Sequence, residues 1–386
     1  METEPHPHTV RAIRRSLLDW FARRRRDLPW RRTRSPYRIW VAETMLQQTQ
    51  SATVIPYYRR FLRRFPTLAA LARAPLGDVL AVWAGLGYYG RARNLHAAAR
   101  EVVERFGGRL PGDEAALRSL PGVGPYTAAA VASIAFGRDA AVVDGNVTRV
   151  LCRVLAQRRD PRQAAVRRWL WETAGRLLPP GQAGDFNQAL MELGATLCTP
   201  RSPACTACPL RRLCRARRLG LQERLPTPAR RRPVPHHSLA VGIIERGGKI
   251  LLVQRPHQGL LGGMWEFPGG RIEAQAEPQA VLACAVREQT GLALVVGAPA
   301  ATVRHAYSHL RVTLHAYHCR ARGRLRLRGI PDARWLAPED LGSVPLPAAA
   351  RRIIEAVWPR MRPDERPQQP AALRAQLSTS RRASAP

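Results

Sequence analysis

The sequence has almost no lysine: Lys249 is the only one among 386 residues, so any chemistry that needs a lysine can occur only there. Long apolar runs are also missing. No stretch reaches the roughly 18 uncharged apolar residues that a membrane-spanning helix needs. The polar N-terminus, METEPHPHTV, lacks the apolar core of a signal peptide. These absences argue against a membrane protein and predict a cytoplasmic one.

Acidic residues are also scarce. There are 28 of them against 62 basic residues, which gives a formal net charge of +34. Such an excess attracts polyanions, of which nucleic acid is the commonest, although the near-exclusive use of arginine is also what a GC-rich genome would produce. Charge alone distinguishes neither DNA from RNA nor binding from catalysis. We expect a nucleic-acid partner and, for a bacterial chain, association with the nucleoid.

Residues 1–220 have the periodicity of helices. Ile13, Leu17 and Phe21 recur at helical spacing behind Thr9, a candidate N-cap. Further apolar-periodic segments, separated by Pro or Gly, cover residues 40–49, 76–85, 91–106, 126–136 and 147–155. We therefore predict that the first domain, residues 1–220, is all helical.

The pattern changes after residue 220. Residues 221–237 (LQERLPTPARRRPVPHH) are rich in Pro and Arg and predict an extended basic linker. In residues 238–358, strand-like runs cover 239–244 and 249–254, which the Gly247-Gly248 turn predicts to form a β-hairpin. Further strand-like runs cover 300–305 and 312–319, and one helix is expected near 278–289. This pattern predicts an α+β second domain, and the Pro-, Arg- and Ser-rich residues 359–386 predict a disordered tail.

Four of the seven cysteines crowd into residues 198–214. They are Cys198, Cys205, Cys208 and Cys214, with the spacing C-x6-C-x2-C-x5-C. In a chain without a secretion signal, so tight a cluster predicts metal binding rather than disulfides. Four thiolates can bind either zinc or a [4Fe–4S] cluster, but these uneven loops differ from the paired C-x2-C motifs of zinc ribbons.

A glycine-rich hairpin and an acidic residue form the next motif. Gly122 and Gly124 lie between two helical segments, where bare backbone amides would let a phosphate approach, although an ordinary turn has the same composition. About 20 residues after the hairpin, Asp144 precedes Gly145 and Asn146 and is also suited to cap the next helix.

The order and spacing of hairpin, aspartate and cysteine loop resemble the endonuclease III superfamily of DNA glycosylases. The resemblance implies a helix–hairpin–helix at residues 120–124, a catalytic Asp144 and a [4Fe–4S] cluster rather than zinc. The arginines of the cluster loop and its flank, Arg201, Arg211, Arg212, Arg215, Arg217 and Arg218, suit it to hold the DNA backbone. Bifunctional members carry, at the position of Tyr126, a lysine that forms a Schiff base. Tyr126 therefore implies a glycosylase without that strand-cleaving activity.

Residues 40–50 (WVAETMLQQTQ) closely resemble the active-site helix of the MutY family of adenine glycosylases, although a solvated helix face would also account for the glutamines. Breaking the N-glycosidic bond requires an acid to protonate the base and an anion to stabilise the sugar cation. By resemblance, Glu43 protonates adenine N7 and Asp144 stabilises the cation or attacks it, while Asn146 and Tyr126 line the pocket and orient Asp144. The apolar neighbours of Glu43 predict a buried carboxyl with a raised pKa.

Adenine must leave the duplex to reach these groups. The Gly-flanked residues 86–89 predict a loop with a protruding apolar pair, although aromatic residues in such segments are usually buried. The resemblance implies that Gln48 and Tyr88 act at the gap and at the opposite base, and the loop makes Leu86 a further candidate for filling the gap.

Residues 259–292 resemble the Nudix fold, whose box aligns without a gap on Gly270 and Gly291. Its metal-binding side chains are mostly replaced: Ala276, Cys284, Ala285 and Gln289 occupy four of the box positions, and only Glu288 remains. One carboxylate cannot hold the Mg²⁺ ions of pyrophosphate hydrolysis, so the domain is expected to be catalytically inactive.

In the MutY family this domain inspects the oxidised guanine through a short loop, which Tyr307, Ser308 and His309 match; an exposed turn is the alternative. The resemblance covers about residues 10–350. It predicts a two-domain, monomeric, monofunctional adenine glycosylase that acts on A opposite 8-oxoguanine or guanine in double-stranded DNA. The alternatives are an endonuclease III-like glycosylase/lyase for oxidised pyrimidines, a Nudix hydrolase fused to a DNA-binding module, and a non-catalytic mismatch binder.

Overall fold

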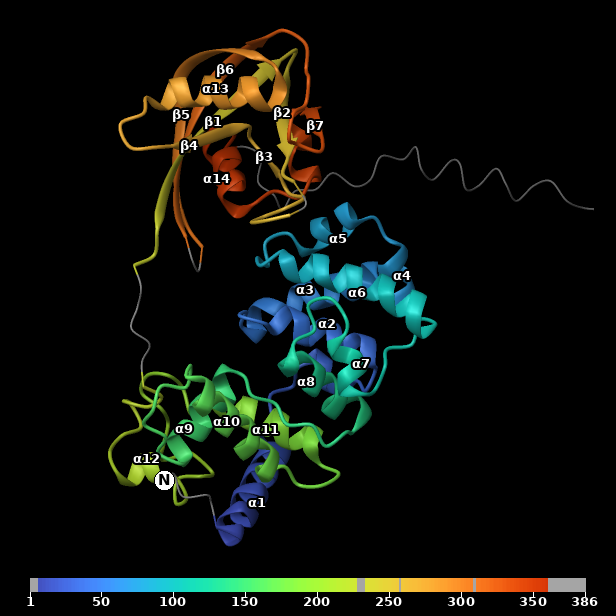
Figure 1. Ribbon diagram of the computed structural model, residues 1–386, viewed down its shortest axis with the longest axis vertical. Helices are drawn as coiled ribbons and strands as arrows, with labels where there is room; N and C mark the ends of the chain where they lie inside the picture. Colours follow the sequence, from blue (N-terminus) through green and yellow to red (C-terminus); the bar gives the residue numbers. More distant parts are fainter. Residues whose placement is uncertain (1–5, 228–232, 257, 308–309, 360–386) are drawn as a thin grey trace, which may run out of the picture. The chain divides into compact units, whose positions relative to one another are not determined.

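The computed structural model describes residues 6–227, 233–256, 258–307 and 310–359. The chain divides into two compact units, Met1–Pro233 and Val234–Pro386 (Figure 1). None of the helices in the described ranges combines the length and the apolar character that crossing a membrane requires.

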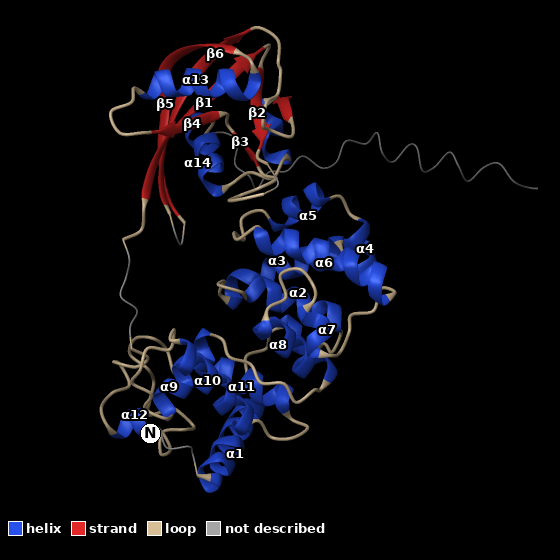
Figure 2. Cartoon of the chain, in the orientation of Figure 1, coloured by secondary structure: helices blue, strands red, loops and turns tan. Residues whose placement is uncertain are grey.

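The described part of the first unit consists of helices and loops and contains no strand (Figure 2), as predicted. The helices are α1 (Pro7–Arg24), η1 (Pro29–Arg32), α2 (Pro36–Leu46), α3 (Ser51–Arg64), α4 (Leu68–Arg73), α5 (Leu76–Trp83), α6 (Gly90–Phe106), α7 (Glu114–Arg118), α8 (Pro125–Phe136), α9 (Gly145–Val154), α10 (Ala164–Leu177), α11 (Ala183–Thr196) and α12 (Arg215–Arg218).

Short polar side chains begin several of these helices. The Ser35 hydroxyl accepts a hydrogen bond from the Arg38 amide at the start of α2, and Asp113 accepts from two amides at the start of α7. The prediction of Thr9 as the N-cap of α1 is wrong. The helix begins at Pro7, with His6 as its N-cap, because the fixed φ angle of proline suits the first helical turn.

Helix α11 packs against α8 and α9, and two of its glycines make the close approach possible. A Cβ on Gly184 would lie 2.6 Å from the carbonyl oxygen of Ser133 in α8, and a Cβ on Gly194 would lie 2.6 Å from the Cβ of Asn146 in α9. Any larger side chain would push the helices apart. The glycines therefore let α11 approach α8 and the start of α9 closely.

The second unit is a mixed sheet with helices on both faces. Its elements are β1 (His236–Arg246), β2 (Lys249–Gln254), β3 (Trp265–Glu266), β4 (Gly269–Ile272), α13 (Pro278–Thr290), β5 (Ala293–Ala306), β6 (Arg311–Arg322), β7 (Ala333–Leu336), η2 (Pro338–Ser343) and α14 (Ala348–Val357). The strand order is β3-β2-β1-β6-β5, with β4 paired to β1 and β7 to β2. Strands β1 and β6 run parallel and the other pairs antiparallel. The predicted hairpin and α+β class are confirmed.

Alternation along the strands divides the core of this unit in two. In β2, Ile250 and Leu252 face the cluster that contains Ile353 of α14, whereas Leu251 faces the cluster that contains Leu282 of α13. The two helices thus cover opposite faces of the sheet (Figure 1).

The residues aligned with the Nudix box, from Gly270 in β4 to Gly291 after α13, pack closely against one another. A Cβ on Gly270 would lie 2.8 Å from the Cβ of Ala285, so β4 and α13 touch closely at this point. The side-chain amide of Gln289 donates to the carbonyl oxygen of Gly269 at 2.9 Å. At a position where the Nudix pattern has a metal-binding glutamate, this chain therefore has a hydrogen bond that ties the helix to the strand.

The start of the predicted linker differs from an extended segment. Leu225 is buried, and its carbonyl oxygen accepts a hydrogen bond from Arg153 at 2.8 Å. The hydroxyl of Thr227 donates to the Arg158 carbonyl. Residues 221–227 thus pack on the helical unit because Leu225 buries apolar surface there. The tail predicted from residue 359 lies, apart from its first residue, outside the described residues.

Candidate active site

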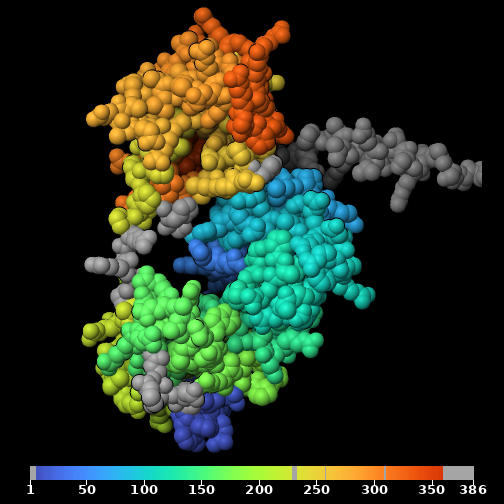
Figure 3. All heavy atoms as spheres, viewed as in Figure 1, coloured from blue at the N-terminus to red at the C-terminus, as the bar shows by residue number. Residues whose placement is uncertain are grey.

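The surface of the helical unit is hollowed between its blue-to-cyan part and its green part (Figure 3).

Glu43 is the first candidate catalytic residue. It comes from α2 and is only 4% exposed. The Tyr126 hydroxyl, from α8, donates a hydrogen bond to Glu43 Oε2 at 2.7 Å. Burial, helped by the nearby Asp144 carboxylate, raises the pKa of Glu43 to about 7 against the opposing effects of the Tyr126 hydrogen bond and Arg31. The raised pKa predicted from the apolar neighbours is confirmed.

Asp144 is both a helix cap and a candidate catalytic carboxylate. Its Oδ1 accepts a hydrogen bond from the Val147 amide at 2.6 Å, as an N-cap of α9 should, and its Oδ2 accepts from Asn146 Nδ2 at 2.9 Å. Burial raises the pKa of Asp144, and these hydrogen bonds oppose the rise by stabilising the ionised form. The Asp144 carboxyl group is therefore fixed in orientation by the start of its own helix.

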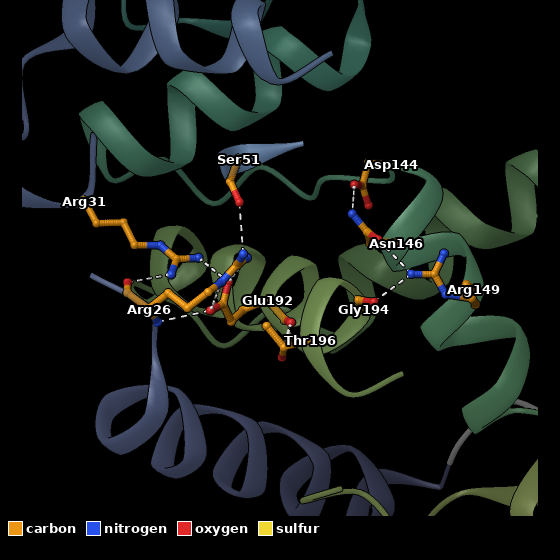
Figure 4. Close-up of polar contacts among 9 residues, drawn as sticks. All are labelled: Arg26, Arg31, Ser51, Asp144, Asn146, Arg149, Glu192, Gly194 and Thr196. Atoms are coloured by element: carbon orange, nitrogen blue, oxygen red, sulfur yellow. Dashed lines mark hydrogen bonds and ion pairs between the residues drawn. The ribbon is translucent and has the colours of Figure 1, made fainter. Parts of the chain in front are cut away.

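A chain of hydrogen bonds extends from Asp144 (Figure 4). Asn146 Oδ1 accepts from Arg149 Nη2 at 2.7 Å, and the same nitrogen donates to the Gly194 carbonyl oxygen at 2.7 Å. Arg149 Nε donates to the carbonyl oxygen of Cys198 at 2.7 Å. Arg149 thus connects the start of α9 with the end of α11 and the first cysteine.

A second buried glutamate was not predicted from the sequence. Glu192, in α11, has a side chain only 1% exposed and accepts from Arg26 at 2.7 Å and from Arg31 at 2.9 Å (Figure 4). Arg26 also donates to the Ser51 hydroxyl at 2.9 Å. Burial alone would raise the pKa of Glu192, but the two arginines outweigh it and lower the pKa to about 2. A lone glutamate in the apolar run ALMELGA was the available signal.

Two loops beside α2 have left-handed backbone at a residue other than glycine, Gln48 at φ 55° and Tyr88 at φ 50°. Such residues are strained and often belong to functional sites. Tyr88 is 41% exposed, as expected, whereas Leu86 is only 6% exposed, so the prediction that an apolar pair protrudes is wrong for Leu86. The positive φ angles of Gly85 and Gly87 turn the chain so that Leu86 points into the core and Tyr88 points out.

The two hairpin glycines, Gly122 and Gly124, have different reasons to be there. Gly122 has φ 72°, and a Cβ on it would lie 2.5 Å from the Cβ of Asn94, so the fold itself requires glycine. Gly124, the N-cap of α8, has an ordinary φ angle, and a Cβ on it would meet nothing within 4 Å. The bare backbone at Gly124 faces open space.

The four clustered cysteines line one cavity, together with apolar residues, Gln222 and the arginines Arg153, Arg211 and Arg217. Arg153 is 2% exposed and donates from Nη1 to the Thr199 carbonyl at 2.6 Å and to Cys198 Sγ at 3.4 Å. Burial raises the pKa of Cys208 to about 12, so its thiol keeps its proton unless a cation lies nearby. Within the described ranges, no three His, Cys, Asp or Glu side chains are close enough to form a preformed single-ion site. Four sulfurs with one buried arginine beside them suit a sulfur-bound cluster.

The proposed lesion loop is described only in part. Tyr307 ends its segment with its amide donating to the Leu310 carbonyl at 2.7 Å and its ring 4.5 Å from that of His305. Ser308 and His309 lie outside the described residues.

Comparison with known proteins agrees with this architecture. Residues 41–176 match the HhH-GPD superfamily of base excision DNA repair proteins, and residues 240–356 match the NUDIX domain. A solved structure of a thermostable thymine-DNA glycosylase is 34% identical, with a TM-score of 0.50, and covers 55% of this chain and 98% of its own. Fold and site together define a helix–hairpin–helix DNA glycosylase domain followed by a Nudix domain.

The chain belongs to the adenine DNA glycosylase family. It is 41% identical to human adenine DNA glycosylase over 402 residues, which cover 89% of this chain and 74% of the human protein. The Schizosaccharomyces pombe adenine DNA glycosylase is 32% identical, with 87% of both chains covered.

Proposed function

We propose that this chain hydrolyses the N-glycosidic bond of adenine mispaired with 8-oxoguanine or guanine in duplex DNA, and leaves the strand intact. The observation that carries the proposal is the pairing of Glu43, whose pKa is raised to about 7, with the capped carboxylate of Asp144. One group keeps a transferable proton near neutral pH while the other is held in place by its hydrogen bonds.

The reaction needs these two roles. Glu43 transfers its proton to N7 of the flipped adenine, so the C1′–N9 bond breaks with its electron pair moving onto the base. Asp144 stabilises the positive charge that develops on the sugar, and its hydrogen bonds from Val147 and Asn146 keep it oriented. Water then adds to C1′ and its proton passes to the Glu43 carboxylate, which restores the acid and leaves an abasic site.

The absence of lyase activity follows from the same site. The hydroxyl of Tyr126 donates to Glu43, and Lys249, the only lysine, belongs to the second unit. The Schiff base of bifunctional glycosylases requires a lysine amine at this position, so that route of strand cleavage is closed, and we expect the abasic strand to remain intact until alkali cleaves it.

The activity is tested with duplexes that carry adenine opposite 8-oxoguanine, guanine, thymine or cytosine. We expect abasic sites with the first two partners, and strand breaks only after alkali. Strand cleavage without alkali would favour the glycosylase/lyase alternative, and tight mispair binding without abasic sites would favour a mismatch binder.

Cys198, Cys205, Cys208 and Cys214 are proposed to hold a [4Fe–4S] cluster, which would rigidify the arginine-rich loop against the DNA backbone. Purified protein should be yellow-brown with about four iron atoms per chain. Stoichiometric zinc without iron after anaerobic preparation would contradict this proposal. Cys208→Ser should weaken folding or DNA binding more than the chemical step.

Discrimination between 8-oxoguanine and guanine is proposed to lie in Ser308 and His309, with Tyr307 beside them and Gln48 and Tyr88 acting from the helical unit. The oxidised base has a protonated N7, which a hydroxyl oxygen can accept from. A neutral hydrogen bond contributes roughly 0.5–1.5 kcal/mol. We therefore expect Ser308→Ala with His309→Ala to narrow the preference for 8-oxoguanine by about tenfold. An unchanged ratio in both binding and excision would mean that residues 307–309 form only a turn.

A further inference from the structure

Arg91 makes an unusual set of contacts near the start of α6. Its Nη1 donates to the carbonyl oxygens of Thr44, Met45 and Gln47, at 3.2, 2.6 and 2.5 Å. These carbonyls belong to the last turn of α2 and the residue that follows it, where no further helical turn supplies donors. The Arg91 guanidinium therefore caps the C-terminal end of the helix that carries Glu43.

The same guanidinium reaches a second loop. Arg91 Nη2 donates to the Gly87 carbonyl at 3.1 Å and to the Thr49 hydroxyl at 3.2 Å, and Nε donates to the Tyr88 carbonyl at 3.4 Å. Its plane also lies over the rings of Trp83 and Tyr88, at 5.5 and 5.2 Å from the centroids. One side chain thus connects residues 44–49 with residues 87–88.

The cation at Arg91 is held without a carboxylate. Burial lowers the pKa of Arg91 to about 10, which still leaves it protonated at neutral pH. Among the described residues, no Asp or Glu forms an ion pair with it, so backbone carbonyls, the Thr49 hydroxyl and aromatic faces stabilise the charge. Removing a charge from water without a carboxylate partner costs free energy, and the Arg91 guanidinium bears this desolvation cost at the point where the two loops meet.

Two of the non-glycine residues with left-handed backbone, Gln48 and Tyr88, lie beside these contacts. Gln48, at φ 55°, directly follows Gln47, whose carbonyl oxygen accepts from Arg91. Tyr88, at φ 50°, follows Gly87, and the carbonyl oxygens of both residues accept from Arg91. Left-handed backbone at such residues persists only where the surroundings enforce it. The guanidinium, with donors fixed in one plane, can enforce both turns at once, which an ammonium group cannot.

We propose that Arg91 is a positioning residue that locks the Gln48 and Tyr88 loops together against the end of α2. In this way it couples recognition of the base pair to the position of the acid Glu43. The inference rests on the proposed function, in which Gln48 and Tyr88 probe the opened base pair. Arg91 itself touches neither the reacting atoms nor, in this role, the substrate.

The test compares Arg91→Met and Arg91→Lys with the control Arg60→Met in the full chain. Arg60 is a fair match because its Nη2 also donates to a backbone carbonyl, that of Val82 at 2.8 Å, and its guanidinium lies 4.5 Å from the Tyr57 ring centroid. The first measurement is hydrogen exchange of the backbone amides in the DNA-free protein. Both Arg91 variants should exchange faster at residues 46–50 and 86–90 together, and Arg60→Met should not.

The second measurement is the ratio of affinities for a duplex with adenine opposite 8-oxoguanine and a duplex with adenine opposite thymine, well below the melting temperature. Arg91→Met should lower this ratio at least tenfold relative to the parent. Arg91→Lys should lower the logarithm of the ratio by more than half as much as Arg91→Met does. If Arg91→Met fails to fold, Arg91→Lys carries both measurements.

Unchanged exchange in the two loops, or faster exchange with an unchanged affinity ratio, would overturn the proposal. If the parent protein removes no adenine, the proposed function fails instead. The exchange experiment then still decides whether Arg91 locks the two loops.

Discussion

Two glutamates in the helical unit are almost equally buried yet have opposite electrostatic character. Glu43 on α2 is 4% exposed and its pKa is raised to about 7, whereas Glu192 on α11 is 1% exposed and its pKa is lowered to about 2. Glu43 receives one hydrogen bond from a neutral phenol, and Glu192 receives charged hydrogen bonds from two arginines. Burial therefore does not decide whether a carboxyl group is an acid or a counter-ion; its donors do.

The comparison also separates catalysis from structure. A neutral buried carboxyl has a proton to give, so it suits a general acid. An ionised carboxylate that neutralises Arg26 and Arg31 has none, but it holds those arginines in place (Figure 4). Arg31 in turn lies near enough to Glu43 to oppose the rise in its pKa. Each glutamate can therefore be tested against the other with the same substitution.

The largest expected effect is on catalysis, in Glu43→Gln. The amide keeps the shape of the side chain and loses the proton, so excision should fall by at least ~10²–10⁴ while mispair binding remains. Single-turnover rates at saturating enzyme measure this. A rate within a few-fold of the parent would remove Glu43 from the mechanism.

The next effect is on stability, in Glu192→Gln. The substitution leaves Arg26 and Arg31 without their counter-ion, and Arg31 is only 10% exposed. We expect a loss of about 3 kcal/mol in the free energy of unfolding, measured by urea denaturation. Glu101→Gln, which removes a more exposed partner of Arg105, should cost less than about 0.5 kcal/mol. Equal losses in the two variants would contradict a special role for the Glu192 network.

Stability should depend on pH in opposite directions at the two sites. Glu43 has a raised pKa in the folded state, so its contribution is fully present below about pH 4.5 and is lost as pH rises to about 7. That loss amounts to about 3 kcal/mol, and it should be absent in Glu43→Gln. Glu192 has a lowered pKa, so its contribution is present above about pH 4.5 and is lost as pH falls toward 2. Unfolding free energies of parent and variants across this range provide the measurement, and parallel curves would refute the assignment of charges.

The smallest effect is expected in Tyr126→Phe. Its hydroxyl lowers the pKa of Glu43, so removing it should raise that pKa and shift the alkaline fall in excision rate, near pH 7 in the parent, to higher pH. Below that fall the rate should drop less than about tenfold, since one hydrogen bond contributes roughly 0.5–1.5 kcal/mol. A shift to lower pH would show that the hydrogen bond has the opposite effect.

Much of the fold and part of the site could be predicted from local pattern. Helical periodicity identified a helical first unit, and the Gly247-Gly248 turn identified the β1–β2 hairpin, because both signals depend on residues close in sequence. Asp144 as a cap is another local feature, since its partner is the Val147 amide three residues away. The burial of Leu86 escaped this reasoning because two glycine turns decide which way its side chain points.

The sequence by itself determined the class of chain, the acid candidate Glu43 within its apolar helix, and the four cysteines that lie within seventeen residues of one another. The tertiary structure alone decided which groups surround each carboxyl. Glu192 meets Arg26 across 166 positions and Glu43 meets Tyr126 across 83, distances over which no sequence periodicity operates. The charge of a buried group depends on such distant donors, so it is fixed only when the helices pack.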